Sequence, residues 1–127
     1  MRSTLGRTLW VVMWLSACNG PDAGSGGPGS GGEFGAASAD RGRTSFLRHC
    51  AICHGSQGDG RGPRAGSVSG TPRDFTNPVW REGKTSEDIF GVISNGLTGT
   101  AMPAWAASLS SSERWDLVAY VLDVARE

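Results

Sequence analysis

Cys50-Ala51-Ile52-Cys53-His54 is the stretch that decides the fold of this 127-residue sequence. Two cysteines three positions apart, with a histidine directly after the second, form the pattern by which a c-type haem is attached to a polypeptide. Each sulfur can form a thioether with one haem vinyl group, and the adjacent histidine is then placed as the proximal iron ligand. The pattern predicts one haem c, covalently bound through two thioethers to Cys50 and Cys53, with His54 on the iron.

Two other interpretations of the same residues are weaker. A structural zinc site needs about four ligands, usually from a second Cys/His pair, and the chain has only one further cysteine and one further histidine. A thioredoxin-like redox pair would begin a helix within a βαβ pattern, and no such pattern is visible. Haem attachment is therefore the strongest of the three interpretations of Cys50, Cys53 and His54.

The second axial ligand can be found by counting side chains. His49 is the only other histidine, but it precedes His54 by five residues on the same helical segment and cannot reach the opposite face of a haem. Met1 and Met13 lie in the predicted export signal, which leaves Met102, next to the stiffening Pro103. The alternative is that Met102 is an ordinary core residue. We predict that Met102 is the second iron ligand.

Residues 1–17 have the features of a bacterial export signal. Arg2 and Arg7 precede an apolar run that ends at Ala17 and is too short to span a membrane, which needs about 20 residues. The run closes on Leu-Ser-Ala before Cys18, an order that resembles the bacterial lipobox, in which the cysteine is lipidated. An ordinary secretory signal with an incidental cysteine is the alternative. With one cysteine for lipid and two for haem, none is left for a disulfide.

Residues 18–38 are dominated by Gly, Ser, Pro and Ala, and they predict a flexible linker after the lipidated cysteine. Residues 39–127 then form one small domain. A domain of this size has a limited apolar core, and a covalently held haem would stabilise it. The formal net charge of the chain is zero, and nothing indicates nucleic-acid binding.

The domain is predicted to be all-α. Gly42, Phe46 and Cys50 recur at four-residue steps in the segment 41–54, which places them on one helix face. Thr85 with an acid three residues on, and Ser110 with Glu113, have the order of capping boxes that open two further helices. The intervening segments 55–84 and 97–109 predict long loops, which are unusual in a compact domain unless they serve a site.

From residue 40 to residue 126 the sequence resembles the class I, single-haem bacterial cytochromes c, which also occur as domains of respiratory oxidase complexes. The matching motifs, in chain order, are Gly42-x3-Phe46-x3-Cys50, Cys50-Ala-Ile-Cys53-His54-Gly55, Gly58-Asp59-Gly60-Arg61-Gly62-Pro63, Pro72-Arg73-Asp74-Phe75-Thr76, Gly99-Thr100-Ala101-Met102-Pro103-Ala104-Trp105 and Leu117-x2-Tyr120. The resemblance implies the cytochrome c fold, with three to four short helices wrapped around one covalently attached haem.

The resemblance also implies roles for single residues. The carbonyl of Pro63 is expected to accept the ring N–H of His54. Arg73 or Trp80 is expected to reach a haem propionate. Gly42 is expected to let the first and last helices approach closely, with Phe46, Leu117 and Tyr120 packed there. One departure is clear: Lys84 is the only lysine, so the lysine ring by which some members dock is absent.

We therefore expect a membrane-tethered electron-transfer protein rather than an enzyme. Its partners would be redox proteins, such as an oxidase, a reductase or a dehydrogenase, together with the membrane that receives the lipid at Cys18, in a periplasm-facing location of a bacterial envelope. Two other functions stay open: a haem-based ligand sensor or small peroxidase with a displaceable Met102, and a structural or metal-binding lipoprotein without haem.

Overall fold

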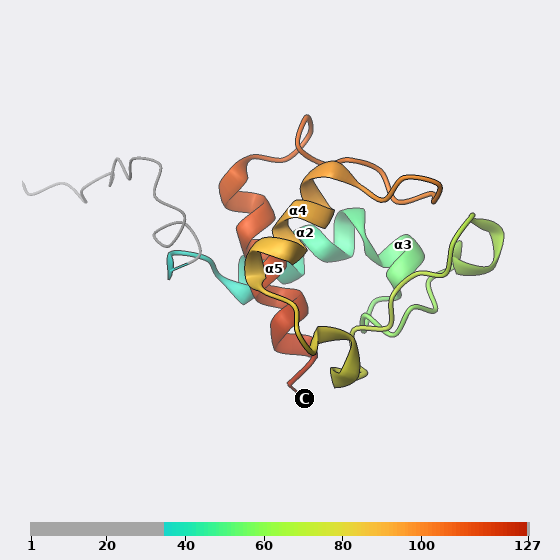
Figure 1. Cartoon of the computed structure of the whole chain (residues 1–127), viewed down its shortest axis with the longest axis horizontal. Helices are drawn as coiled ribbons and strands as arrows, with labels where there is room; N and C mark the ends of the chain where they lie inside the picture. The colour runs from blue at the N-terminus through green and yellow to red at the C-terminus, as the bar shows by residue number, and fades with distance from the viewer. Residues whose placement is uncertain (1–34, 127) are drawn as a thin grey trace, which may run out of the picture.

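A computed structural model of the chain describes residues 35–126, which form helices joined by long loops (Figure 1). The α-helices are α2 (Ala39–His49), α3 (Ala51–His54), α4 (Ser86–Asn95) and α5 (Ser111–Val124), and two short 3-10 turns, η1 (Ala65–Ser67) and η2 (Pro78–Arg81), lie in the long loop. Residues 35–126 contain no β-strand. The all-α prediction is confirmed, whereas the predicted signal, Cys18 and most of the predicted linker lie outside the described residues.

The segment that holds the CxxCH motif is helical, as predicted, but it is divided into α2 and α3. Ser38 caps α2 by accepting a hydrogen bond from the backbone N–H of Arg41. Cys50 stands between the two helices with φ −110° and ψ −33°. The backbone hydrogen bonds continue across it, from Cys50 N to the Phe46 carbonyl and from His54 N to the Cys50 carbonyl. Both cysteines and the histidine therefore follow α2 in an almost continuous helical path.

Both predicted capping boxes are present. In α4 the Thr85 side chain accepts from the backbone of Asp88, and the Asp88 carboxylate accepts from the backbone of Thr85. Ser110 and Glu113 make the same reciprocal pair at the start of α5. Each box satisfies backbone N–H groups that have no partner within the helix. α4 ends at Gly96, which is the C-cap and adopts a φ of 68°.

The domain is held together by the packing of α2 against α5, which is the most extensive contact between its helices. A Cβ on Gly42 would overlap the backbone carbonyl of Asp116 and lie 2.8 Å from the Cβ of Tyr120. Phe46 and Tyr120 then meet with ring centroids 5.0 Å apart, and Leu117 is fully buried beside them. The predicted close approach at Gly42 is confirmed.

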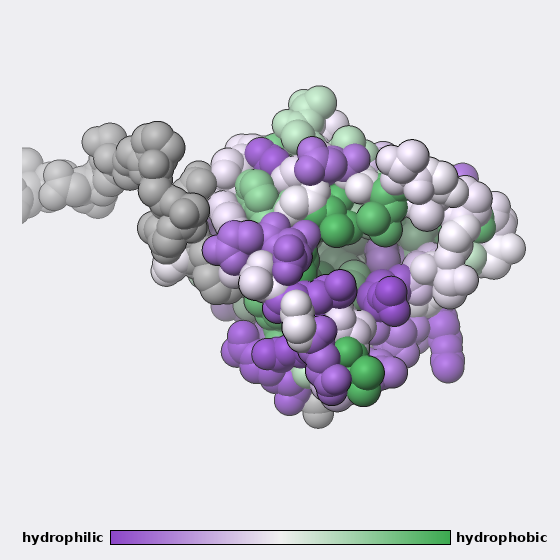
Figure 2. All heavy atoms as spheres, viewed as in Figure 1, coloured by the Kyte–Doolittle hydropathy of each residue, from purple (hydrophilic) through white to green (hydrophobic). Residues whose placement is uncertain are grey.

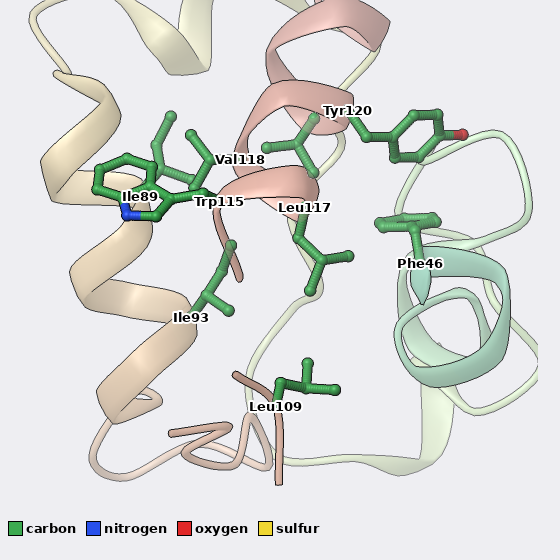
Figure 3. Close-up of a cluster of buried hydrophobic side chains, with 9 residues drawn as sticks. Phe46, Ile89, Ile93, Leu109, Trp115, Leu117, Val118 and Tyr120 are labelled. Carbon is green, nitrogen blue, oxygen red and sulfur yellow. The ribbon is translucent and has the colours of Figure 1, made fainter. Parts of the chain in front are cut away.

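α4 covers the other side of α5 and completes the apolar core (Figure 3). The core side chains come from α2, α4, α5 and the end of the loop before α5. They are Phe46, Ile89, Ile93, Leu109, Trp115, Leu117, Val118, Tyr120 and Val121.

The last residues of the predicted linker are attached to the domain by a buried carboxylate. Asp116 accepts hydrogen bonds from the Arg41 guanidinium, at 2.7 and 2.8 Å, and from the backbone N–H of Ser38, at 2.7 Å. Arg41 also donates to the carbonyl of Ala36 at 2.9 Å. The chain is therefore fixed to α5 from Ala36 onward.

No helix between residues 35 and 126 is long and apolar enough to cross a membrane.

Candidate functional site

A largely apolar cavity of about 330 Å³ lies between α3, α4 and the two long loops, and it opens as a hollow in the face shown in Figure 2. Cys50, Cys53 and His54 line it from the CxxCH segment, and Met102 lines it from the loop after α4. The structure thus brings the four principal predicted site residues, from segments about 50 residues apart, to one cavity. The apolar walls include Phe46, Val68, Phe75, Trp80, Ile89, Ile93, Trp105, Leu117 and Val121.

The imidazole of His54 is fixed in orientation and in tautomer. Its Nδ1 lies 3.0 Å from the backbone carbonyl oxygen of Arg73. Because a carbonyl can only accept, Nδ1 carries the proton and the lone pair of Nε2 is free for a metal. The ring stacks on Phe75 with centroids 4.8 Å apart. Burial lowers the pKa of His54, against the raising effect of the hydrogen bond to Arg73, so the neutral form that binds metals is favoured.

The prediction that Pro63 supplies this carbonyl is wrong. Pro63 is exposed and does not line the cavity, and the carbonyl of Arg73 takes the role instead. The physical reason is the path of the loop: the residues on either side of Pro63 are hydrogen-bonded to the carbonyls of Cys53 and Ile52, and the carbonyl that reaches His54 belongs to Arg73.

The glycine-rich turn that contains Pro63 has a different function, which is to support α3. The backbone N–H groups of Gly60, Gly62 and Arg64 donate to the carbonyls of His54, Cys53 and Ile52, at 2.8, 3.0 and 2.9 Å. A Cβ on Gly62 would lie 2.5 Å from two carbonyl oxygens of this segment. The turn therefore satisfies the free carbonyls at the end of the short helix and holds the CxxCH segment in place.

Trp80, which is expected at a haem propionate, lines the cavity. Its indole N–H donates to the carbonyl of Phe75 at 3.0 Å. Its ring meets that of Phe75 edge-on, with centroids 5.1 Å apart. Trp80 thus holds Phe75 against His54. Arg73 lines the cavity and is exposed, so its guanidinium stays a candidate for a carboxylate at the rim.

The two thiols are unpaired, as attachment to a cofactor requires. Burial, and secondarily the neighbouring Cys53, raise the pKa of Cys50 to about 12, which keeps that sulfur as a neutral thiol. Among residues 35–126 no group of three or more His, Cys, Asp and Glu side chains is placed to hold a metal ion.

The loop that carries Met102 is irregular but firmly fixed. The backbone N–H of Met102 donates to the hydroxyl of Thr100 at 3.2 Å, and its carbonyl accepts from Leu97 at 3.2 Å. Ala101 donates to the carbonyl of Ser69 at 2.9 Å, which joins this loop to the other one. A Cβ on Gly96 would lie 2.6 Å from the Met102 carbonyl oxygen, so only glycine fits under the loop.

Three residues of the cavity were not singled out as site residues from the sequence. Phe75 stacks on His54, and only the resemblance of its segment pointed to it. His49 lines the cavity beside Trp105, with ring centroids 5.3 Å apart. Lys84 is exposed and lines the cavity. No periodic signal marks them, because two of the three lie in loops.

These residues fit a haem c. The cavity offers two unpaired thiols, a neutral imidazole with a free Nε2 and a thioether, which together are the donor set of a c-type haem with His and Met on the iron. The remaining walls are mostly apolar, as a porphyrin requires. A backbone carbonyl that accepts the ring N–H of the histidine is typical of metal-binding imidazoles.

Comparison with known proteins supports this assignment. Residues 37–121 match the family model described as cytochrome C oxidase, cbb3-type, subunit III. Curated relatives include the cbb3-type cytochrome c oxidase subunit FixP of Azorhizobium caulinodans, 35% identical over 83 residues. Subunit CcoP of Azospirillum brasilense is 34% identical over 86 residues. The matches cover 65% and 68% of this chain but only 26% and 28% of these relatives.

Solved structures give the same result. The chain superposes on a subunit of the Kuenenia stuttgartiensis reducing HAO-like protein complex Kustc0457/Kustc0458 with a TM-score of 0.62 and 33% identity, covering 68% of this chain and 43% of that one. It superposes on the KustC0563 c-type cytochrome with a TM-score of 0.55 and 27% identity, covering 65% and 95%. The chain belongs to the cbb3-type cytochrome c oxidase subunit III family, and it is a single-haem c-type cytochrome that binds its haem c covalently.

Proposed function

We propose that this chain is a one-electron carrier in which Cys50 and Cys53 would form the two thioethers of haem c, and the His54 imidazole and the Met102 thioether would bind its iron. The single observation that supports the proposal is the convergence of these four side chains on one cavity from two distant segments. When bound, haem c supplies a one-electron couple. The chain's part would be to fix both ligands: the carbonyl of Arg73 holds His54, and Thr100 and Leu97 hold the backbone of Met102.

The fixed position of Met102 in its loop favours a carrier over a sensor or a peroxidase. The backbone of Met102 is hydrogen-bonded to Thr100 and to Leu97, and its carbonyl packs closely against Gly96, which has no side chain. A sulfur ligand held in place would leave no open position on the iron, which would disfavour oxygen or peroxide chemistry. It also raises the reduction potential relative to a second imidazole. No substrate is chemically changed, so we do not class the chain as an enzyme.

Carbon monoxide binding by the reduced protein tests this proposal. The wild-type protein should not bind carbon monoxide at neutral pH. Met102→Ala should bind it and should have a lower reduction potential. Thr98→Ala is the matched control, because Thr98 is an exposed residue of the same loop that does not line the cavity. Carbon monoxide binding by the wild type, or an unchanged ferric sulfur-to-iron charge-transfer band in Met102→Ala, would refute Met102 as a ligand.

We propose further that the carrier is anchored in the bacterial envelope through a lipid at Cys18, facing the periplasm. Support comes from the order of charges, apolar run and cysteine in residues 1–18. Stable anchoring needs more than one acyl chain, which bacterial lipoproteins provide. Cys18→Ser should move the haem-loaded protein from the membrane fraction to the periplasmic fraction. Retention of the variant in membranes would refute the lipid anchor.

The redox partner is proposed from the relatives. Both curated relatives are named as subunits of cbb3-type cytochrome c oxidase, so a terminal oxidase is the first partner to test, before a reductase or a dehydrogenase. Oxidation of the reduced protein by purified cbb3-type oxidase should be catalytic in oxidase. No oxidation above the rate without oxidase would direct the search to the other two classes.

A further inference from the structure

Two phenyl rings in the cavity wall contact the imidazole of His54, and one of them covers its face. Phe75 stacks on the imidazole, with ring centroids 4.8 Å apart and ring planes 21° apart. Phe46 is further away and tilted, at 6.3 Å and 49°. The two phenyl rings also meet each other edge-on, with centroids 6.2 Å apart. His54 is therefore one of three rings in mutual contact, and Phe75 is the ring that lies parallel to it.

Phe75 is itself fixed through its backbone and its side chain. Its backbone N–H donates to the carbonyl of Gly58 at 2.7 Å, and its carbonyl accepts from the indole N–H of Trp80 at 3.0 Å. The ring of Trp80 meets the ring of Phe75 edge-on, with centroids 5.1 Å apart. Both backbone polar groups of Phe75 are thus occupied, and its ring is packed between neighbours, so it presents a fixed surface to His54.

The hydrogen bond from His54 to the carbonyl of Arg73 does not by itself fix the angle of the imidazole plane. Rotation about the bond between Cβ and the ring is a broad, roughly two-fold torsion in histidine. The hydrogen bond from Nδ1, at 3.0 Å, selects one of the two flips. It permits a range of ring angles within that flip, because a hydrogen bond weakens steeply only when its angle falls below about 120°. A stacked ring narrows the range, because turning the imidazole would drive its edge into the face of Phe75.

We propose that Phe75 is a positioning residue, whose stacked ring holds the imidazole plane of His54 at one angle in both redox states of the haem-loaded protein. This inference rests on the proposed carrier function, in which His54 would bind the iron. Groups that contact a metal-binding histidine orient its ring and tune the metal. A ligand plane that does not turn when an electron arrives or leaves adds nothing to the structural rearrangement that electron transfer requires.

Proton NMR of the ferric, haem-loaded protein tests the proposal. The haem methyl groups have unequal shifts, in part because the imidazole plane has one preferred direction. Removal of the stacked ring in Phe75→Leu should let the imidazole sample several angles, and the spread of the methyl shifts should narrow. Phe75→Tyr keeps the ring and should retain the wild-type spread. An unchanged spread in Phe75→Leu, or equal narrowing in Phe75→Tyr, would overturn the proposal.

Phe90→Leu is the matched control, because Phe90 forms a similar stack away from the cavity. Its ring lies 4.2 Å from that of Trp115, with ring planes 20° apart, and it does not line the cavity. The substitution should lower the denaturation midpoint and leave the methyl shifts unchanged. Equal narrowing by Phe90→Leu and Phe75→Leu would mean that general loosening of the domain is the cause, and the proposed role of Phe75 would be wrong.

A measurement on the wild type keeps the proposal testable if Phe75→Leu fails to fold or to hold haem. In the ferrous protein, the ring protons of Phe75 should show nuclear Overhauser effects to the ring protons of His54, whereas those of Phe90 should not. Absence of effects between Phe75 and His54 in the reduced protein would contradict a stack that persists in both redox states.

These experiments separate the role of Phe75 from the proposed carrier function. A wild-type protein that holds no haem, or that binds carbon monoxide when it is reduced, would refute the carrier function itself. A haem-loaded carrier in which Phe75→Leu has the methyl shifts of the wild type would refute only the positioning role of Phe75.

Discussion

The Nδ1 atom of His54 lies 3.0 Å from the backbone carbonyl oxygen of Arg73, 19 residues further along the chain. This contact links the CxxCH segment to the returning loop and fixes which imidazole nitrogen faces the cavity. In the ferrous, haem-loaded protein, the Nδ1 proton of His54 should show nuclear Overhauser effects to the backbone of residues 73 and 74. Effects to Pro63 in place of these would contradict the contact.

Because Arg73 acts on His54 through its backbone, its side chain should be dispensable for that role. Arg73→Ala should keep the haem, the iron ligands and the charge-transfer band of the sulfur ligand. Pro63→Ala should do the same, because Pro63 does not line the cavity. Loss of haem ligation in Arg73→Ala, measured by the absorption spectrum of the exported protein, would mean that the guanidinium is essential to the site.

The contact between Gly42 and Asp116 predicts a large effect of a single methyl group. A Cβ on Gly42 has no room against the backbone of α5, and overpacking of this kind costs about 1–3 kcal/mol. Gly42→Ala should lower the free energy of unfolding by about that amount in denaturant titrations. Gly91→Ala is the control in α4, where a Cβ would meet nothing within 4 Å. There alanine should stabilise the helix by up to about 1 kcal/mol. Equal effects of both substitutions would contradict the close approach of α2 and α5.

The helix starts and the cofactor attachment could be predicted from the residues themselves, because they depend on residues near one another in the chain or on a motif with one chemical use. The close contact between Gly42 and α5 joins distant residues, and only the resemblance to the cytochromes c implied it. The acceptor for His54 could not be predicted, because any carbonyl of a 30-residue loop can serve and the choice depends on the path of that loop. The same reason explains Trp80: its indole bonds to a carbonyl five residues away, a contact that has no sequence pattern.

Thr100 is expected to position Met102. Its hydroxyl accepts from the Met102 N–H at 3.2 Å and donates to the Leu97 carbonyl at 2.8 Å. Thr100→Val keeps the shape but loses both hydrogen bonds, each of which contributes about 1 kcal/mol. The sulfur-to-iron band should then weaken, and carbon monoxide should gain access to the reduced protein.

Two further variants separate this positioning from general stability. Thr100→Ser should restore the band, because it restores the hydroxyl. Thr98→Val, at an exposed position in the same loop, should leave the band unchanged. A normal band in Thr100→Val would show that the rest of the loop is sufficient to hold Met102.

The capping boxes predict how acid affects stability. Hydrogen bonds from the Ser110 backbone, and then from its side chain, lower the pKa of Glu113, and the equivalent bonds from Thr85 lower the pKa of Asp88. A carboxyl with a lowered folded-state pKa binds its proton more weakly than in the unfolded chain. Its contribution is therefore complete above the unfolded pKa and is lost as pH falls through the folded pKa.

Glu113→Gln should accordingly melt at a lower temperature than the wild type at pH 7, and the difference should shrink in acid below the usual glutamate range. Glu87→Gln, in the first turn of α4 but outside the capping box, is the control. A constant difference across the whole pH range would show that the charge of Glu113 does not contribute to the cap.

Intact-mass analysis of the exported protein, with mapping of the peptide that contains residues 50–54, tests covalent haem attachment at Cys50 and Cys53. The mass of one haem is expected on that peptide, and the double variant Cys50→Ala, Cys53→Ala should lack it. An exported chain whose Cys50 and Cys53 peptide has no added haem mass would contradict covalent attachment.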